Sequence, residues 1–589
     1  MTTRQKVTIG AFALIIFQLS VRIWAIWNGW FYGDDFKFLS QASTEPLTLD
    51  FLFTRHQQQL MPGGILIAWL VGQGPAFSWP LAAAVIVVMQ AMASVACFVM
   101  LTRLFGRRPG ILIPLAVYLF CPLTLGAFMW WAASLNQIPL QIAFFLILAT
   151  HVEYLRTHRL RWLAASAALL AFGMLFYVKA VVMIPILAFL SISYFARGRL
   201  DRRLWSALRQ AWFLWLTYAL AAAGYLFAYA QSGESPIGGA RDAAYFETAD
   251  RQIREALGPA LVGGPWRWLD PGRQDVLANA PEFAVTIAWI VIAAVVGLTI
   301  RQHSGAWRAW LMLALYLVPT IFLTANGRAS LFGPDVGLYF RYLTDVAVVA
   351  CLALACASMS IIGARDPLTP RARAEDNPRG MIAVGLLLFA FGSLWSTITY
   401  AHFWQREGPV QTFVSNARSS LAPVEGVQII DEPVADMFVL QPNAPFNRPS
   451  KILAPLKKHI TPVLHGTDLQ MFGTSGRLGP AIVTPGITSK PVNTDCGYLV
   501  KGKKERTVDL EHVVTHETWW MSVNYLASSS GDMRIDAGDN ALTFAYEEGP
   551  HTFFLRTTGS YDAVTMKILN GDAGICVSTI AVGFVGTFN

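Results

Sequence analysis

Charged residues are scarce in this sequence. Only 14% of its 589 residues are charged, whereas 54% are hydrophobic and the mean hydropathy is +0.45. Soluble domains carry roughly 25% charged residues, so the composition excludes a chain that is soluble throughout. The deficit lies in the first 400 residues, where apolar runs of about 20 residues recur, each long enough to cross a bilayer. After Tyr400 the pattern changes to short alternating stretches broken by Gly, Pro and Asn.

Several motifs of soluble enzymes are absent as well. The sequence contains no Walker A segment, no Gly-rich strand–turn–helix, no HExxH and no CxxC pair. Because no basic loop is long enough to hold a nucleotide-binding domain, an activated substrate would have to arrive through the membrane. The net charge of +8 does not indicate nucleic acid, since the basic residues lie between apolar runs, as topology signals do.

Cysteine is also rare, with six residues in the chain. Four of them lie within apolar runs, where a free thiol behaves as a small apolar side chain. Only Cys496 and Cys576 lie in the C-terminal part, which we expect to face an oxidising compartment. These two cysteines are therefore predicted to form a disulfide.

The apolar runs predict about eleven membrane-spanning helices. Short basic loops alternate with longer or acidic loops between them. The basic set belongs in the cytoplasm, and an odd number of spans then puts the C-terminal part outside. The sequence thus divides into a membrane domain, residues 1–400, and an extracytoplasmic domain, residues 401–589. The predicted spans are 7–29, 78–102, 111–129, 137–155, 162–178, 180–196, 210–231, 282–300, 306–324, 341–362 and 381–399. The basic set comprises Arg103, Arg107, Arg108, Arg156, Arg159, Arg161, Arg197, Arg199, Arg202, Arg203, Arg301, Arg308, Arg365, Arg371, Arg373 and Arg379.

The extracytoplasmic domain has the pattern of a β-rich fold. Short alternating stretches and turn-rich joints predict a β-sandwich or jelly roll. Jelly rolls often bind carbohydrate, although that analogy rests on the fold alone. The predicted strands are 427–431, 481–484, 506–510, 518–526, 541–546, 551–557, 563–569 and 575–583.

The strongest polar cluster follows the first span. Asp34 and Asp35 lie directly after Gly33, at the depth of the lipid headgroups. A carboxylate near hydrocarbon has its charged form desolvated and its pKa raised, which suits a general base. The alternative is that either residue caps the helix that follows. Because adjacent helical residues diverge by about 100°, one Asp is expected to face a cavity while the other caps or orients.

Two further outer segments carry polar or aromatic side chains. The run from His56 through Gln57 and Gln58 to Gln59 precedes a Pro-Gly-Gly break, and His56 is a candidate donor to a sugar hydroxyl or a phosphate. Trp131 is a candidate for stacking on a sugar, and Asn136 adds a donor at the same level. The alternatives are a solvated interfacial loop for the first segment and an aromatic belt for the second.

Two basic side chains lie at outer helix ends. Lys179 is the only charged residue in its apolar surroundings, so it is a functional candidate by default. Arg341 offers a fork that matches a phosphate. The alternatives are snorkelling of Lys179 to the interface and an Arg341–Asp345 ion pair. A base together with such cations would serve transfer of a sugar from a polyprenyl phosphate to a hydroxyl, with inversion, because a phosphate leaves without help from an acid.

Gly33-Asp34-Asp35 after the first span, Lys179 after the fifth, and the Arg341-Tyr342 pair near the tenth resemble the GT-C superfamily of integral membrane glycosyltransferases. The resemblance implies a polyprenyl-phosphate sugar donor, a glycan or glycolipid acceptor and an acidic base in the first outer loop. It also implies a substrate-binding role for Tyr342. A membrane region followed by a β-rich domain is similar to bacterial cell-wall arabinosyl- and mannosyltransferases. The resemblance therefore implies that the protein lies in a bacterial plasma membrane, in contact with its lipids.

Three points stay open at this stage. Members of the superfamily differ in their need for a divalent metal, and the lack of a further acidic cluster favours a reaction that requires no cofactor. A ligase or polymerase of lipid-linked glycans would share the phosphate-binding cations. A non-enzymatic carrier of a lipid-linked sugar is disfavoured, because carriers show inverted repeats and the sequence shows none.

Overall fold

The computed structural model describes residues 1–56, 59–231, 243–271, 275–371, 379–435, 438–439, 441–570 and 574–588. Of the positions named above, Gln57, Gln58 and Arg373 lie outside these residues. The chain forms two compact units, a membrane unit, Met1–Arg406, and a C-terminal unit, Glu407–Asn589.

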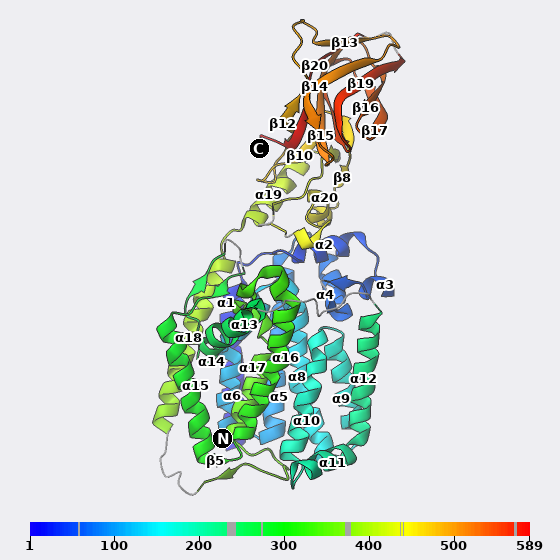
Figure 1. Ribbon diagram of the computed structural model, residues 1–589. Coiled ribbons are helices and arrows are strands. Elements are labelled where there is room, and N and C mark those ends of the chain that lie inside the picture. The colour runs from blue at the N-terminus through cyan, green and yellow to red at the C-terminus, as the bar shows by residue number, and fades with distance from the viewer. Residues whose placement is uncertain are drawn as a thin grey trace. The chain divides into compact units, whose positions relative to one another are not determined.

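The membrane unit is a bundle of apolar helices (Figure 1). Within the described residues, seven helices are long and apolar enough to cross a membrane, and a pair bent by 44° raises that number to eight. The chain is therefore a multi-pass membrane protein. The seven are α1 (Thr3–Ile26), α5 (Trp79–Phe105), α8 (Trp131–Thr157), α12 (Trp212–Ala230), α15 (Glu282–Gln302), α16 (Trp307–Phe332) and α18 (Arg379–Trp404), and the bent pair is α6 (Leu112–Phe120) with α7 (Leu125–Met129).

The three remaining predicted spans coincide with shorter helices. These are α9 (Leu160–Met174), α10 (Met183–Tyr194) and α17 (Val346–Ser358), of 15, 12 and 13 residues. Each is shorter than the roughly 20 residues that cross a bilayer alone. Two of them are preceded by 3₁₀ turns, η3 (Val178–Val182) and η6 (Phe340–Tyr342). Lys179 and Arg341 thus lie in 3₁₀ turns and not in regular α-helix.

Short elements connect the helices at both ends of the bundle. Figure 1 shows α2 (Asp35–Thr44), α3 (Leu49–Leu52) and α13 (Ala243–Asp250) at one end. The opposite end carries α11 (Leu200–Gln210) and the paired strands β5 (His303–Ser304) and β6 (Thr369–Pro370).

The basic loops meet at the end that carries α11. The Arg156 guanidinium donates to the Arg103 carbonyl at 2.8 Å and to the Ile362 carbonyl at 2.7 Å. Arg203 and Arg308 both pair with Asp366, at 2.6 and 3.1 Å. Loops from five different parts of the sequence therefore lie on one side of the bundle, as their shared charge predicted.

The C-terminal unit is a jelly roll preceded by a smaller mixed sheet. One large sheet has the order β12-β20-β15-β18-β9, with β13 also paired to β20, and the other has the order β14-β19-β16-β17. Strands β13 to β20 are divided between the two sheets in the Greek-key pattern of a jelly roll, with β16 and β17 as a hairpin within one sheet. Met521 and Val523 from one sheet pack with Val564 and Met566 from the other in a shared core. The predicted sandwich is confirmed.

The strands of this unit are β7 (Gly426–Ile429), β8 (His459–Pro462), β9 (His465–Thr467), β10 (Gln470–Phe472), β11 (Leu478–Pro480), β12 (Ile482–Thr488), β13 (Tyr498–Lys501), β14 (Arg506–Val514), β15 (Trp519–Ala527), β16 (Gly531–Ala537), β17 (Asn540–Tyr546), β18 (Gly549–Thr557), β19 (Tyr561–Asn570) and β20 (Gly574–Gly586). The predicted Cys496–Cys576 disulfide is present and ties the segment before β13 to β20.

Candidate functional site

Asp35 is a buried structural carboxylate. It is fully buried, and its two oxygens accept hydrogen bonds from the backbone N–H groups of Tyr32, at 2.9 Å, and Ala132, at 2.8 Å. Burial raises the pKa of the Asp35 carboxyl well above its usual range, and the two N–H donors oppose that shift. Because both of its oxygens accept hydrogen bonds, Asp35 holds the loop after α1 against the start of α8.

Asp34 has a different environment. It occupies the N-cap position of α2, but its side chain makes no capping hydrogen bond. Its Oδ2 instead lies 3.2 Å from Nε2 of His56, and its side chain keeps 12% of its surface exposed. The His56 ring packs 4.4 Å from the ring of Phe38. The Asp34 carboxylate thus contacts a side chain, whereas both oxygens of Asp35 are held by backbone N–H groups.

The left-handed turn before these residues separates their directions. Gly33 has φ +55°, a conformation that glycine adopts at little cost. Its backbone passes close to Trp130, whose indole N–H donates to the Tyr32 carbonyl at 3.0 Å. The turn lets Asp35 point into the protein while Asp34 turns toward His56.

Lys179 is paired inside the protein. Its ammonium lies 3.0 Å from Oδ1 of Asp345 and donates to the Tyr342 carbonyl at 2.8 Å. Asp345 is fully buried and also accepts a hydrogen bond from the Tyr316 hydroxyl at 2.6 Å. Lys179 keeps only 4% of its surface exposed, so it does not snorkel to the interface. Asp345 neutralises the Lys179 charge, and the hydrogen bond to the Tyr342 carbonyl fixes the backbone next to Arg341.

Arg341 lies in an aromatic cage. Its guanidinium carbon is 4.8 Å from the ring centre of Trp130, 4.2 Å from that of Tyr339 and 4.9 Å from that of Tyr342. Its carboxylate partner is Asp275, so the predicted alternative of an Arg341–Asp345 pair is wrong. Asp345 is already held by Lys179. The Arg341 side chain keeps 16% of its surface exposed.

Tyr342 connects these groups. Its hydroxyl accepts from Nη2 of Arg341 at 3.3 Å. The Trp130 ring, which packs on Arg341, also donates its indole N–H to the Tyr32 carbonyl, two residues before Asp34. The loop that carries Asp34 and the segment that carries Arg341 therefore meet at one indole, although about 300 residues separate them in the sequence.

One predicted substrate contact, Trp131, lies differently from expectation. Trp131 is fully buried, so its ring cannot stack on a sugar in this structure. Its neighbour Trp130 holds the position against Arg341 instead, because the chain turns inward where α8 begins. Asn136 is partly exposed and donates to Oε1 of Gln59 at 3.1 Å, which places it beside the polar run that starts at His56.

The sequence did not identify Asp275, the partner of Arg341, or Tyr316, which donates a hydrogen bond to Asp345. Asp275 and Tyr316 have no local motif: the first is an isolated acid in a long loop, and the second lies within an apolar helix. A polar hydroxyl at a buried helical position is the only sequence signal for Tyr316, and it is weak. Among the described residues, no three His, Cys, Asp or Glu side chains are grouped as metal ligands.

Comparisons with known proteins give distant likenesses. No protein-family model and no curated protein matches the chain. The oligosaccharyltransferase AglB from Archaeoglobus fulgidus, solved with an inhibitory peptide and a dolichol-phosphate, has 11% identity and a TM-score of 0.34 over 70% of this chain. The arabinofuranosyltransferase AftD from Mycobacteria has 9% identity and a TM-score of 0.33 over 99%. The arabinosyltransferase EmbB from Mycobacterium smegmatis has 10% identity and a TM-score of 0.28 over 98% of this chain.

The matched region spans 58%, 61% and 64% of the lengths of those three chains, in the same order. At TM-scores this low, the roles of individual residues are drawn from this chain's own geometry.

Proposed function

We propose that the protein is an inverting membrane glycosyltransferase. It would move a sugar from a polyprenyl-phosphate donor to a glycan or lipid acceptor of the cell envelope. The observation that carries the proposal is that the Asp34–His56 pair and the caged guanidinium of Arg341 lie on segments that meet at Trp130. A base and an anion-binding cation are the two groups that this transfer requires.

The reaction follows from these two groups. Asp34 takes the proton of an acceptor hydroxyl, whose oxygen attacks the anomeric carbon from the face opposite the phosphate. The bond from that carbon to the phosphate oxygen breaks, and the polyprenyl phosphate leaves with the electron pair. Arg341 stabilises the departing phosphate, because charge-assisted bonds from a guanidinium suit its oxygens. No acid is needed at the leaving group. We propose that the reaction requires no metal or other cofactor.

Lys179 takes a positioning role in this proposal. Its ammonium is already bound by Asp345 and by the Tyr342 carbonyl, so it acts on the donor through the Arg341-Tyr342 segment. His56 orients Asp34. Asn136 and Trp130 line the same region, and we assign them to contact with substrate.

The proposed site faces the outside of a bacterial plasma membrane. The basic loops gather at the end of the membrane unit that carries α11, and arginine-rich loops stay in the cytoplasm. The disulfide of the C-terminal unit suits an oxidising compartment. We assign that unit to the outer face, as a jelly roll that presents the acceptor glycan.

The test uses the purified full chain in liposomes. We expect transfer from a radiolabelled polyprenyl-phosphate sugar, with inverted configuration at the anomeric carbon of the product, and no transfer from nucleotide sugars. Arg341→Lys keeps the charge but loses the fork, so it should raise KM for the donor about tenfold. Transfer from a nucleotide sugar, or a product with retained configuration, would overturn the proposal.

A further inference from the structure

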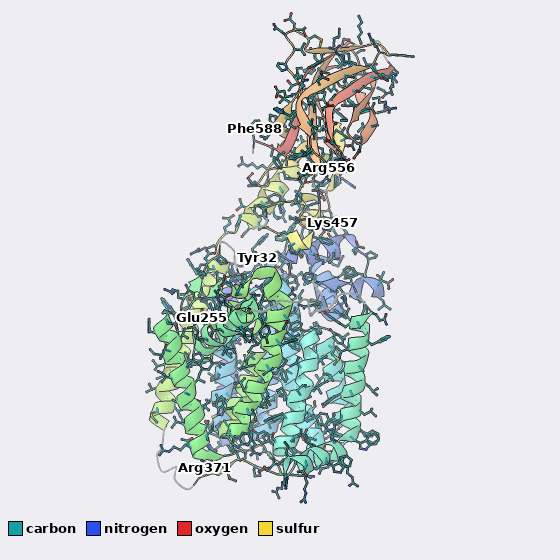
Figure 2. The ribbon with its side chains drawn as sticks, in the orientation of Figure 1. Tyr32, Glu255, Arg371, Lys457, Arg556 and Phe588 are labelled. Carbon is teal, nitrogen blue, oxygen red and sulfur yellow. A yellow bond between two sulfur atoms is a disulfide. The ribbon has the colours of Figure 1, made fainter. Side chains whose placement is uncertain are left out.

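Arg22 is a charged residue inside the membrane unit. It lies on α1, one turn before that helix ends at Ile26. Figure 2 shows this end of the membrane unit at Tyr32, opposite the end that carries Arg371. An arginine so close to a helix end can extend its guanidinium to the lipid headgroups. Arg22 does not do so, because it keeps only 3% of its surface exposed.

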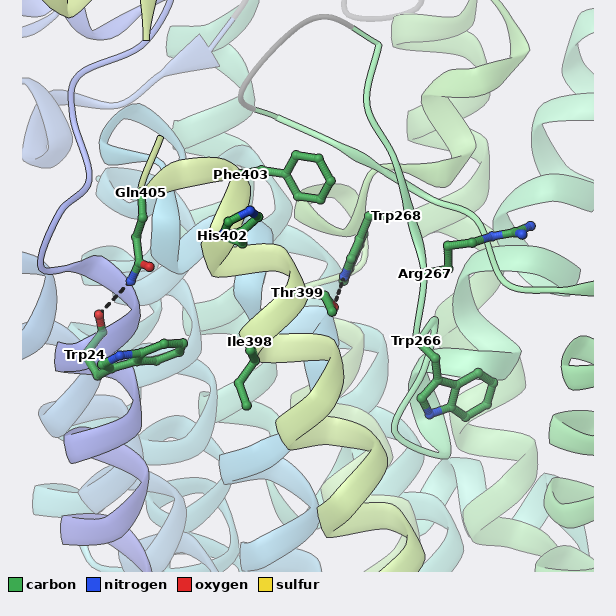
Figure 3. Close-up of a pocket in the computed structure, with 9 residues that line it drawn as sticks. All are labelled: Trp24, Trp266, Arg267, Trp268, Ile398, Thr399, His402, Phe403 and Gln405. Carbon is green, nitrogen blue, oxygen red and sulfur yellow. Dashed lines mark hydrogen bonds between the residues drawn. The ribbon is translucent and has the colours of Figure 1, made fainter. Parts of the chain in front are cut away.

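The end of α1 is held in place next to Arg22. The side-chain amide of Gln405, directly after α18, donates to the Trp24 carbonyl at 2.9 Å and to the Ala25 carbonyl at 3.1 Å. Figure 3 marks the first of these bonds. Carbonyls in the last turn of a helix have no partner within the helix, so Gln405 satisfies two of them. The burial of Arg22 is therefore a property of a packed helix and not of a frayed end.

The contacts of the Arg22 guanidinium are uncharged. Nη2 donates to the Thr124 hydroxyl at 2.5 Å, and the guanidinium carbon lies 5.0 Å from the ring centre of Phe128. Nη1 is buried and has no hydrogen-bond partner among the described residues. No Asp or Glu of the described residues forms an ion pair with Arg22. The protein therefore encloses this charge without supplying its counter-charge.

Another buried arginine of the membrane unit shows the usual arrangement. Arg308 is 7% exposed, and its guanidinium pairs with Asp366 at 3.1 Å. A buried charge is normally paired in this way, because burial removes the water that would otherwise stabilise it. Arg22 departs from that arrangement at an even lower exposure.

Gln18 supplies a second buried donor. It lies four residues before Arg22, so the two side chains are neighbours on one face of α1. Gln18 is 1% exposed, and its Oε1 accepts a hydrogen bond from the Ser94 hydroxyl of α5 at 3.3 Å. Its Nε2 is buried and has no partner among the described residues. Two unpartnered N–H donors thus occupy the same buried face, and one of them is charged.

The charge decides what kind of ligand these donors suit. A water molecule or an amide oxygen can accept from Nη1, but neither neutralises the guanidinium. The face of the Phe128 ring carries only partial negative charge. The carbonyl end of α6 amounts to roughly half an elementary charge. An anion with a single charge balances Arg22 completely, whereas a divalent anion would leave one negative charge uncompensated in the same buried region.

We infer that Arg22 and Gln18 hold a small monovalent inorganic anion, such as chloride, inside the membrane unit. Nη1 of Arg22 and Nε2 of Gln18 donate to the ion, while the Thr124 hydroxyl accepts from the other side of the guanidinium. This site is separate from the proposed transfer reaction and does not depend on it.

The ion would stabilise the segment that leads to the candidate site. Thr124 ends the short 3₁₀ turn η2 (Pro122–Thr124), and α7 follows it directly. The Thr344 hydroxyl donates to the Leu123 carbonyl of this turn at 2.9 Å. Gly126 of α7 packs so closely that an added Cβ would lie 3.0 Å from the backbone nitrogen of Arg341. A neutralised Arg22 thus supports the backbone against which Arg341 packs.

The test measures chloride binding to the purified full chain in detergent. Radioactive chloride is titrated at constant ionic strength, with sodium gluconate as the replacement salt. We expect saturable binding of one ion per chain and an unfolding temperature that rises with chloride and then levels off. Arg22→Met should abolish both effects, because an apolar side chain in this position needs no counter-charge. The matched control is Arg308→Met, which removes a similarly buried arginine that has its own carboxylate and should keep chloride binding.

A second variant and a second measurement complete the test. Gln18→Leu keeps the charge but loses one donor, so it should raise the Kd for chloride about tenfold. Crystals of the unaltered chain grown with bromide should show an anomalous peak beside Arg22, and this measurement needs no variant. A chain without saturable chloride binding, which would leave only water at Arg22, overturns the inference. Unchanged binding in Arg22→Met, or bromide peaks only elsewhere, would overturn it as well. Sugar transfer is not measured, so none of these outcomes bears on the proposed function.

Discussion

The carboxyl groups of Asp34 and Asp35 differ in what surrounds them. Asp35 is fully enclosed and holds two backbone N–H groups, whereas Asp34 keeps 12% of its side-chain surface exposed and faces His56. The sequence was sufficient to predict that the two neighbours diverge, because adjacent residues at a helix start point in different directions. It could not predict which one is buried, since the donor at Ala132 lies about 100 residues away.

The same limit applies to the cations. Lys179 and Arg341 were identifiable as exceptions in apolar surroundings, but their partners Asp345 and Asp275 follow from tertiary contacts. A lone charge in an apolar helix shows that a partner must exist. It does not show whether that partner is a substrate or another side chain.

The Lys179–Asp345 pair gives a test at the scale of single residues. Asp345→Asn leaves the Lys179 charge buried without its carboxylate, so we expect a loss of about 3 kcal/mol in the free energy of unfolding. Lys179→Met should cost a similar amount, and the double variant less than the sum of the two. Thermal unfolding of the purified protein in detergent measures all three. A Lys179→Met variant with unchanged stability and a raised KM for the donor would instead make Lys179 a phosphate ligand.

The shortened helices show why the site lies where it does. The 3₁₀ turns η3 and η6 replace regular helix at the positions of Lys179 and Arg341. Irregular backbone at membrane depth is tolerated where it is buried in protein or lines a cavity. Hydropathy predicted the existence of these spans, but window reading assigns full length to any apolar run. It therefore could not predict that α10 and α17 stop short.

The strands of the C-terminal unit were predicted in part. Strands with clear alternation, such as β15 and β18, coincide with predicted ranges, whereas β13, β16 and the short strands β8 to β11 were missed. Short edge strands have too few residues for a period of two to be recognised. The pairing of β9 with β18 therefore came from the structure alone.

That pairing has an expected dependence on pH. His551 on β18 bonds through Nδ1 to Asp468, just after β9, at 2.6 Å, and this bond raises the pKa of the His551 imidazole. A raised pKa in the folded state stabilises the protein below the unfolded value of about 6.5, and that contribution is lost as the pH rises through the folded pKa. Protease protection of β9 and β18 should thus fall as the pH rises above about 6.5.

His551→Gln should abolish this pH dependence in the full chain, with cleavage mapped by mass spectrometry. His512→Gln is the control, because His512 is exposed on β14. An unchanged profile in His551→Gln would show that the pair does not stabilise the β9–β18 contact.

At the scale of the whole molecule, the division into a helical membrane unit and a β-rich C-terminal unit follows from composition alone. The break in hydropathy near residue 400 lies close to the boundary after Arg406. The packing of the helices could not be predicted, because an apolar run shows that a helix is buried in lipid or protein but not which neighbour it contacts.

The orientation of the chain in the membrane is testable by labelling. Cysteines introduced at Asp50 and Lys503, both exposed, should react with a membrane-impermeant maleimide in intact right-side-out cells. A cysteine at Arg107, exposed in a basic loop, should react only after the membrane is opened. The four native free cysteines are buried, so they add little background. Reaction at position 107 in intact cells would reverse the proposed topology.

The most direct test of the account compares Asp34→Asn with Asp35→Asn. Sugar transfer from a polyprenyl-phosphate donor and thermal unfolding are measured for both variants, with Asp50→Asn as the control in the same loop. We expect Asp34→Asn to lower the transfer rate by about 10²–10⁴ with an unchanged unfolding temperature. Asp35→Asn should cost about 1–3 kcal/mol of stability through its lost acceptor. An Asp34→Asn variant that transfers sugar at the wild-type rate would contradict the account.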